Sequence, residues 1–338
     1  MLFFLKRPNL NILNLNLFFL LCFLFFVFLS VGGFDTRIQV VLLLTLISFS
    51  GFMLLPSYLS DDQLNMMLNY VVLSAVFVSL ISFYEYFYMW PVLGDYWRAT
   101  GGYRSVSTML NPNNLGVYLG VSLLILLLHS RFAIFWRFLA IVIITAALLM
   151  SGSRTAVVSI VIPLIIGLLF SHRQKLKING LLLFVVILFV FSGLVVFALI
   201  TGYLSLGRYF NFETAVIRLD KYFSYLSMFD VSYFSPDFKF ARSFYVSESS
   251  YFYFLNTFGI LLSVFFGFLY LVFFRINWAF ISLFGPRRIL MLIVLYYGIS
   301  FMFENMIASF PNNQFFFFAL GAILLPRRID SRTRGCYV

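Results

Sequence analysis

The residues of this chain with the clearest chemical potential are arginines that interrupt its long apolar runs. Arg154 stands in the short sequence Ser-Gly-Ser-Arg-Thr, and Arg98 and Arg104 stand in an aromatic segment with a Gly-Gly turn. A guanidinium group is always charged and can bind a phosphate group through two parallel hydrogen bonds. These arginines therefore predict a binding site for a phosphate-bearing ligand. The competing interpretation is that each one anchors the chain among lipid headgroups.

A fourth arginine, Arg218, lies in a segment with helical periodicity. Between residues 212 and 229, apolar residues recur at steps of three and four and cover one face, while charged residues fall on the other. This pattern predicts an amphipathic helix that lies flat in a membrane interface. Arg218 projects from the edge of the apolar face, where it can reach a lipid headgroup or a lipid-linked phosphate. Arg208 adds a further cation to the same polar stretch.

Two acidic residues are candidates for a role beside these cations. Glu248 lies in Ser-Glu-Ser-Ser-Tyr, just before an apolar run. A carboxylate there is either stabilised by the dipole of the following helix or available as a general base in a partly dry site. Glu304 lies near the end of another apolar run, where the helix dipole disfavours an acid. It is a candidate partner for one of the arginines.

The sequence lacks the usual signatures of a bound metal or cofactor. His, Cys, Asp and Glu residues show no metal-ligand spacing, and no Asp-x-Asp pair occurs. Neither a phosphate-binding loop nor a dinucleotide glycine motif is found. We therefore expect no metal and no cofactor.

The elements that must position these residues are membrane spans. Of 338 residues, 62% are hydrophobic and only 10% are charged, whereas a soluble domain carries roughly 25% charged residues. This composition excludes a water-soluble enzyme, a disordered chain and a disulfide-stapled secreted domain. We expect an all-α, polytopic membrane protein, a single domain over 1–338 with about ten transmembrane helices. The predicted spans are 12–31, 38–55, 66–84, 113–130, 132–150, 155–171, 180–201, 249–274, 289–307 and 313–326.

The distribution of charge orients these predicted spans. Lys6 and Arg7 precede the first span and indicate a cytoplasmic N-terminus. With alternating spans, the cytoplasmic segments then carry the whole net charge of +11, and the outer segments sum to zero. Both termini are predicted to be cytoplasmic, and the arginines and acids described above fall outside. Two outer segments are long, about 85–112 and 202–248, and the second contains the amphipathic interfacial helix.

Four short stretches, taken in order, carry a resemblance to a known family. They are Arg104 followed by 111–116 (NPNNLG), 153–156 (SRTA), Arg218 with Tyr222, and 248–251 (ESSY) with Gly259-Ile260 beyond it. The Pro-Asn-Asn-Gln sequence at 311–314 also fits. In type and order they resemble the O-antigen polymerase and ligase superfamily of Wzy/WaaL-type membrane proteins, and the chain looks closer to the polymerases.

The resemblance implies an activity and roles for individual residues. The activity is polymerisation of undecaprenyl-pyrophosphate-linked oligosaccharide repeat units, by metal-independent, inverting glycosyl transfer at the periplasmic face of the bacterial inner membrane. Arg154 and Arg218 would bind the pyrophosphate, helped by Arg104. Ligases of this family typically have a His where this chain has Glu248, which favours the polymerase and makes Glu248 the expected base. Arg98 and Arg208 complete the expected substrate-binding set.

Two other functions remain open at this point. One is an O-antigen ligase, which transfers the glycan to a lipid A-core acceptor. The other is a non-enzymatic flippase or transporter of the same lipid-linked glycan, although the nearly uncharged spans argue against it. The expected partners are the lipid-linked donor and acceptor, membrane lipids, a chain-length regulator and a flippase. Nucleic acid is not expected, because orientation accounts for the positive charge. The product is lipopolysaccharide O-antigen or capsule.

Overall fold

The computed structural model describes residues 52, 55–56, 58–90, 92, 98–99, 102–129, 132–172, 220, 223, 249, 251, 286–304 and 311–324. This part of the chain is helical. Its helices are α3 (Asp61–Tyr88), α4 (Pro112–Leu128), α5 (Ile134–Ser151), α6 (Arg154–His172), α12 (Pro286–Phe303) and α13 (Asn312–Leu324). The long connection from α3 to α4 contains a two-residue ladder, β1 (Arg98–Ala99) with β2 (Gly102–Tyr103), and a short 3₁₀ turn, η2 (Ser107–Met109).

Three of these helices, α3, α5 and α12, are long and apolar enough to cross a membrane. The apolar helix α4 has 17 residues, and α13 has only 13. Each of the six helices matches a predicted span to within a few residues. The remaining predicted spans lie outside the described residues apart from isolated positions, so ten spans are not shown.

Local chemistry explains where the helices begin and end. Ser60 and Gln63 form a reciprocal capping box at the start of α3, which makes that helix longer than its predicted apolar core. The Asn111 side chain accepts a hydrogen bond from the backbone of Asn113, and Pro112 occupies the first position of α4. Gly152 closes α5 in the left-handed conformation with a φ of 61°.

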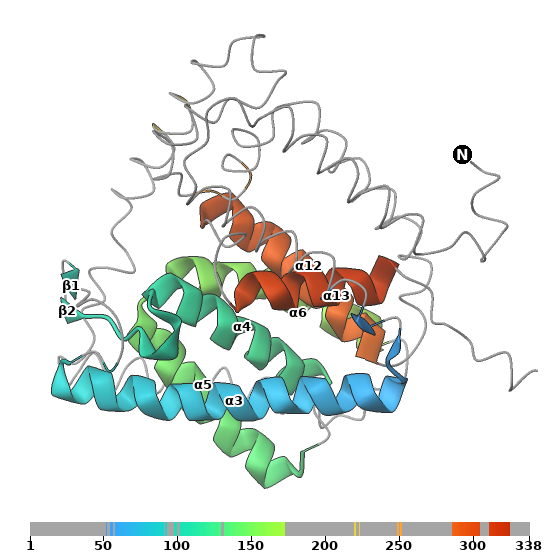
Figure 1. Cartoon of the computed structure of the whole chain (residues 1–338), viewed down its shortest axis with the longest axis horizontal. Coiled ribbons are helices and arrows are strands. Elements are labelled where there is room, and N and C mark those ends of the chain that lie inside the picture. Colours follow the sequence, from blue (N-terminus) through green and yellow to red (C-terminus); the bar gives the residue numbers. More distant parts are fainter. Residues whose placement is uncertain are drawn as a thin grey trace, which may run out of the picture.

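The helices alternate in direction. Figure 1 shows α3 running across the lower part of the bundle, with its C-terminal end and the β1–β2 ladder on the left. At this end α3, α5 and α12 finish and α4, α6 and α13 begin, and hydrogen bonds join the helix ends across it. We call it the network end. The opposite end holds Arg137, Arg287 and Arg288 and is called the basic end. Relative to one another, these six segments alternate as the sequence predicts.

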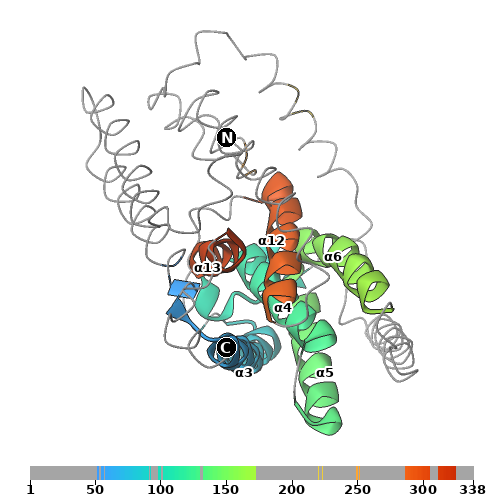
Figure 2. The same cartoon turned by 90° about the vertical axis from the view of Figure 1, so that its right-hand side faces the viewer.

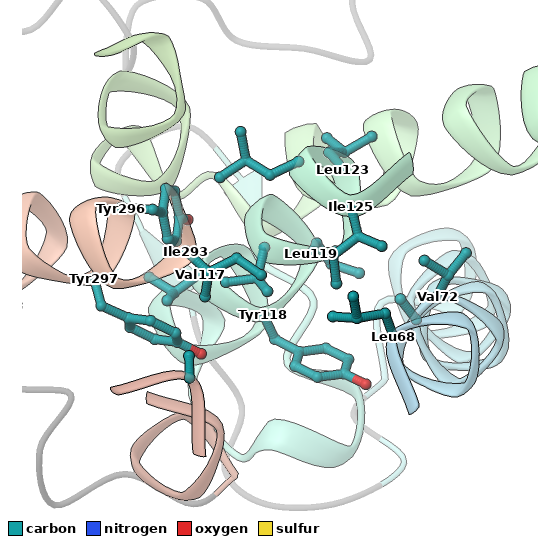
Figure 3. Close-up of a cluster of buried hydrophobic side chains, with 14 of the residues drawn as sticks. Leu68, Val72, Val117, Tyr118, Leu119, Leu123, Ile125, Ile293, Tyr296 and Tyr297 are labelled. Atoms are coloured by element: carbon teal, nitrogen blue, oxygen red, sulfur yellow. The ribbon is translucent and has the colours of Figure 1, made fainter. Parts of the chain in front are cut away.

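Helix α4 lies at the centre of the bundle. In Figure 2 it lies among α3, α5, α6, α12 and α13, and it packs against all of them. Its residues from Leu115 to Leu126 are buried, as expected for a helix that is apolar on every side. Figure 3 shows Leu68 and Val72 of α3 on one side of α4, and Tyr296 and Tyr297 of α12 on the other.

The outer face of α3 is apolar in a regular pattern. Large side chains recur at alternating steps of four and three and are each about half exposed or more. They are Met66, Tyr70, Leu73, Phe77, Leu80, Tyr84 and Phe87. An exposed apolar stripe of this length is unusual in a water-soluble monomer and is typical of a helix that faces lipid.

Candidate functional site

Arg104 occupies the centre of the network end. It follows strand β2 and is buried, with only 8% of its surface exposed. Its Nε donates to the carbonyl oxygen of Ser151 at 2.8 Å, and its Nη2 donates to Oδ1 of Asn113 at 2.5 Å. The planar guanidinium group therefore ties the end of α5 to the start of α4.

Asn113 connects Arg104 to a buried carboxylate. Its Nδ2 donates to Oε2 of Glu304 at 2.9 Å, and Oγ1 of Thr155 donates to Oε1 of the same carboxylate at 3.2 Å. The orientation of the Asn113 amide is set by chemistry, because arginine only donates and a carboxylate only accepts. The structure thus connects Glu304 to Arg104 through Asn113. Arg104, Asn113, Thr155 and Glu304 are referred to below as the network.

A second carboxylate, Glu85, holds the segment that carries Arg104. Glu85 lies in the last turn of α3 and is fully buried. One carboxylate oxygen accepts the backbone N–H of Val92 at 2.9 Å, and the other accepts those of Val106 and Ser107 at 2.9 and 2.6 Å. Because Val106 is two residues from Arg104, these bonds determine where the guanidinium group enters the bundle.

The two Pro-Asn-Asn sequences of the chain lie side by side. Nδ2 of Asn312, the first residue of α13, donates to the carbonyl oxygen of Asn114 at 3.1 Å, and the Tyr297 hydroxyl donates to Oδ1 of Asn312 at 3.2 Å. Both sequences begin a helix, as predicted. Their meeting across 198 residues of chain is visible only in the structure.

Arg154 lies at the edge of the network. It is half-buried and opens α6, between Ser153, whose hydroxyl accepts the backbone N–H of Ala156, and Thr155, which contacts Glu304. Gly116 of α4 leaves no room for a side chain against Ser153, so this turn is fitted closely to the bundle. Of the two arginines, Arg154 is the more accessible, whereas Arg104 is engaged in the interior. Arg104 therefore joins α4 and α5 through its bonds to Asn113 and Ser151.

The remaining predicted residues are only partly placed. Arg98 lies in β1, paired with Tyr103, so its backbone is beside the residue that precedes Arg104. Glu248, Arg208 and Arg218 lie outside the described residues. The residue after Glu248 is described: the Ser249 hydroxyl donates to the carbonyl oxygen of Phe301 at 3.0 Å, near the C-terminal end of α12.

Ser249 therefore brings the ESSY stretch to the network end. Phe301 is three residues before Glu304, and one turn further down α12 the Tyr251 hydroxyl donates to the Gly298 carbonyl oxygen at 2.7 Å. Three of the four stretches singled out in the sequence, together with the 311–314 sequence, thus meet at one end of the bundle. The fourth, around Arg218, has only Asp220 and Phe223 among the described residues.

For three residues of the network end, the sequence did not predict the contacts that the structure shows. Asn113 was read only as part of a helix cap, Glu85 as one of several outer acids, and Glu304 as a partner of unspecified arginines. The available signal was their polarity at the ends of apolar helices, where a buried polar group needs a partner.

Among the described residues, no group of three or more His, Cys, Asp or Glu side chains is placed to hold a metal ion. No family model, no curated protein and no solved structure was found to match the chain.

Proposed function

We propose that the chain is a polysaccharide polymerase that joins undecaprenyl-pyrophosphate-linked oligosaccharide repeat units into O-antigen or capsule. The network end would face the periplasm, at the outer surface of the bacterial inner membrane. Both chain termini would then be cytoplasmic. The lipid-linked donor and acceptor would reach the site laterally from the bilayer, where their lipid chains remain.

The observation that carries this proposal is the meeting of distant stretches at the network end. Arg104 with its NPNNLG stretch, Arg154 in SRTA, Ser249 in ESSY and Asn312 in PNNQ come from four separate parts of the chain. They gather where six helix ends meet. An arginine-bearing, partly dry helix end is suited to an anionic group that stays attached to a membrane lipid.

The proposed reaction is a displacement at the anomeric carbon of the donor sugar. The acceptor hydroxyl oxygen forms the new glycosidic bond as the bond from carbon to pyrophosphate oxygen breaks. Glu248 takes the hydroxyl proton as general base. Arg154 and Arg218, with Arg98 and Arg208, stabilise the negative charge that develops on the departing pyrophosphate. Arg104 and Glu304 hold the helix ends beside Arg154.

Replacement of Arg154 tests the proposal against a matched arginine. Arg154→Gln should shorten the surface glycan severely at normal protein levels, because removal of one preorganised charge costs roughly 10²–10³-fold in rate. Arg137→Gln, at the basic end, should leave glycan length unchanged. Gel analysis of the glycan measures both. Long chains in the Arg154 variant would overturn the assigned role.

Deletion of the chain separates the proposal from its alternatives. Loss of a polymerase should leave single repeat units on the acceptor, whereas loss of a ligase should leave none attached. A flippase would not lengthen the glycan in a purified system. Purified protein in nanodiscs, supplied with lipid-linked repeat units, should therefore produce longer lipid-linked chains.

A further inference from the structure

A line of buried hydroxyl groups descends from the network into the interior of the bundle. On α12, Tyr296 and Ser300 lie eight and four residues before Glu304, so all three share one face of the helix. On α6, Ser159 lies four residues after Thr155, on the face that contacts Glu304. Tyr296, Ser300 and Ser159 are each 0% exposed.

The contact between Thr155 and Glu304 sets the register of the two helices. Because α6 begins and α12 ends at the network end, both lines of polar residues run inward from this contact. Ser159 therefore falls at the level of Ser300, and Tyr296 lies one turn deeper. From the third side, Gly120 of α4 lies directly against the Tyr296 hydroxyl. Helices α4, α6 and α12 thus enclose one polar seam.

Within the described part of the chain, the hydroxyls of this seam have no hydrogen-bond partner of good geometry. Those of Tyr296, Ser300 and Ser159 make no hydrogen bond in the structure. Tyr296 and Ser300 lie close enough to influence each other, yet their hydroxyls do not meet the geometry of a direct bond. The buried hydroxyls of two other serines are bonded: Ser122 donates to the Tyr118 carbonyl oxygen, and Ser79 donates to that of Ala75.

Three unsatisfied hydroxyls in one seam need an explanation, because a buried polar group without a hydrogen bond is costly. Ordered water is the ligand that buried polar groups of this kind usually bind, typically through about three hydrogen bonds. Beyond Tyr296 the seam is closed, since Gly167 of α6 packs against Leu128 and Leu292. Among the described residues the deep end of the seam is therefore closed, and water would enter it from the network end.

We propose that the seam between α4, α6 and α12 is a hydration site, in which water molecules bridge Tyr296, Ser300 and Ser159 and extend from Glu304 into the bundle. This water lets a carboxylate and three hydroxyls share an otherwise apolar interior. The inference concerns the helices alone and holds whether or not the chain is a polymerase.

Water-edited solid-state NMR of the wild-type protein in nanodiscs tests the seam directly. With tyrosine and phenylalanine labelled, the Tyr296 and Phe318 signals are identified by their loss in Tyr296→Phe and Phe318→Leu. The polarisation transfer of Tyr296 from water should be several-fold faster than that of the buried Phe318 ring, which is 2% exposed. Transfer as slow as that of Phe318 would overturn the proposal.

The sign of a stability change gives an independent test. Removal of an unsatisfied, dry hydroxyl should raise Tm, whereas removal of one bound to water should lower it. Tyr296→Phe and Ser300→Ala should each lower Tm by about 2 °C, and the pair should lower it by less than the sum because they share water. Tyr118→Phe is the matched control for the loss of a bonded hydroxyl, because the Tyr118 hydroxyl donates to the Val71 carbonyl oxygen. A rise in Tm for both seam variants would refute the hydration site.

Discussion

At the basic end of the bundle, Arg137 donates to the Leu127 carbonyl oxygen at 2.7 Å and Arg288 donates to that of Gly167 at 2.8 Å. At the network end, Arg104 donates both to a carbonyl oxygen and to the Asn113 side chain, which continues to Glu304. The basic end therefore uses arginine to bind helix backbone. The network end uses it to order other side chains.

The difference lies in what each end requires of its neighbours. A carbonyl oxygen is present whatever the residue, and those towards the end of a helix carry partial negative charge, so a basic side chain there finds a partner in almost any sequence. The network needs Asn at 113, Thr at 155 and Glu at 304, from helices up to 191 residues apart. Substitutions should therefore be tolerated at one end and not at the other.

The largest contrast is expected between two acids of the same helix, Glu85 and Asp62. Glu85→Ala leaves the buried backbone N–H groups of Val106 and Ser107 without an acceptor, which should lower the free energy of unfolding by about 3 kcal/mol or more. Asp62→Ala removes an exposed charge from the first turn of α3 and should cost about 0.5 kcal/mol. Thermal unfolding in nanodiscs measures both variants. Equal losses of stability would contradict the role of Glu85 as the acceptor for these backbone groups.

A smaller contrast is expected between matched arginine replacements. Arg104→Lys should lower the free energy of unfolding by about 2 kcal/mol, because an ammonium group cannot reproduce the fork that joins Ser151 to Asn113. Arg137→Lys should cost less than about 1 kcal/mol, because a lysine can still reach the Leu127 carbonyl oxygen. Comparable losses at the two positions would show that Arg104, too, needs only a positive charge.

The smallest expected effect concerns the hydrogen bond between Asn113 and Glu304, where a second substitution should restore the stability that the first one removes. Asn113→Asp keeps the acceptor for Arg104 but sets two carboxyl groups against each other, at a cost of about 1–2 kcal/mol. When Glu304→Gln is added, the new amide at position 304 can donate to the new carboxylate at position 113. The double variant should therefore regain most of the lost stability. A double-mutant cycle measures this coupling. Additive losses would mean that Asn113 and Glu304 act independently.

The sequence alone located the helices well, for local reasons. Apolar runs define them, and the signals that begin or end them, such as Asn111 before Pro112 or Gly152 after α5, act within one turn. Alternating topology also placed Arg104, Arg154 and Glu304 at a common level of the bundle. The length of α3 was underestimated, because the helix begins at the capping box of Ser60 and continues through Glu85 to Tyr88, beyond the predicted apolar core.

The pairing of polar side chains could not be predicted from the sequence. The pairing of Asn113 with Glu304 depends on how α4 sits against α12, and that register is set by close contacts such as Gly120 against Tyr296. Hydropathy is the same for every register of two apolar helices, so it cannot select one. The sequence by itself determined that the chain forms apolar helices with arginines at their ends. Only the tertiary structure decided that Arg104 is buried and bonded to Ser151 and Asn113 while Arg154 lies at the edge, because that depends on how six helix ends pack together.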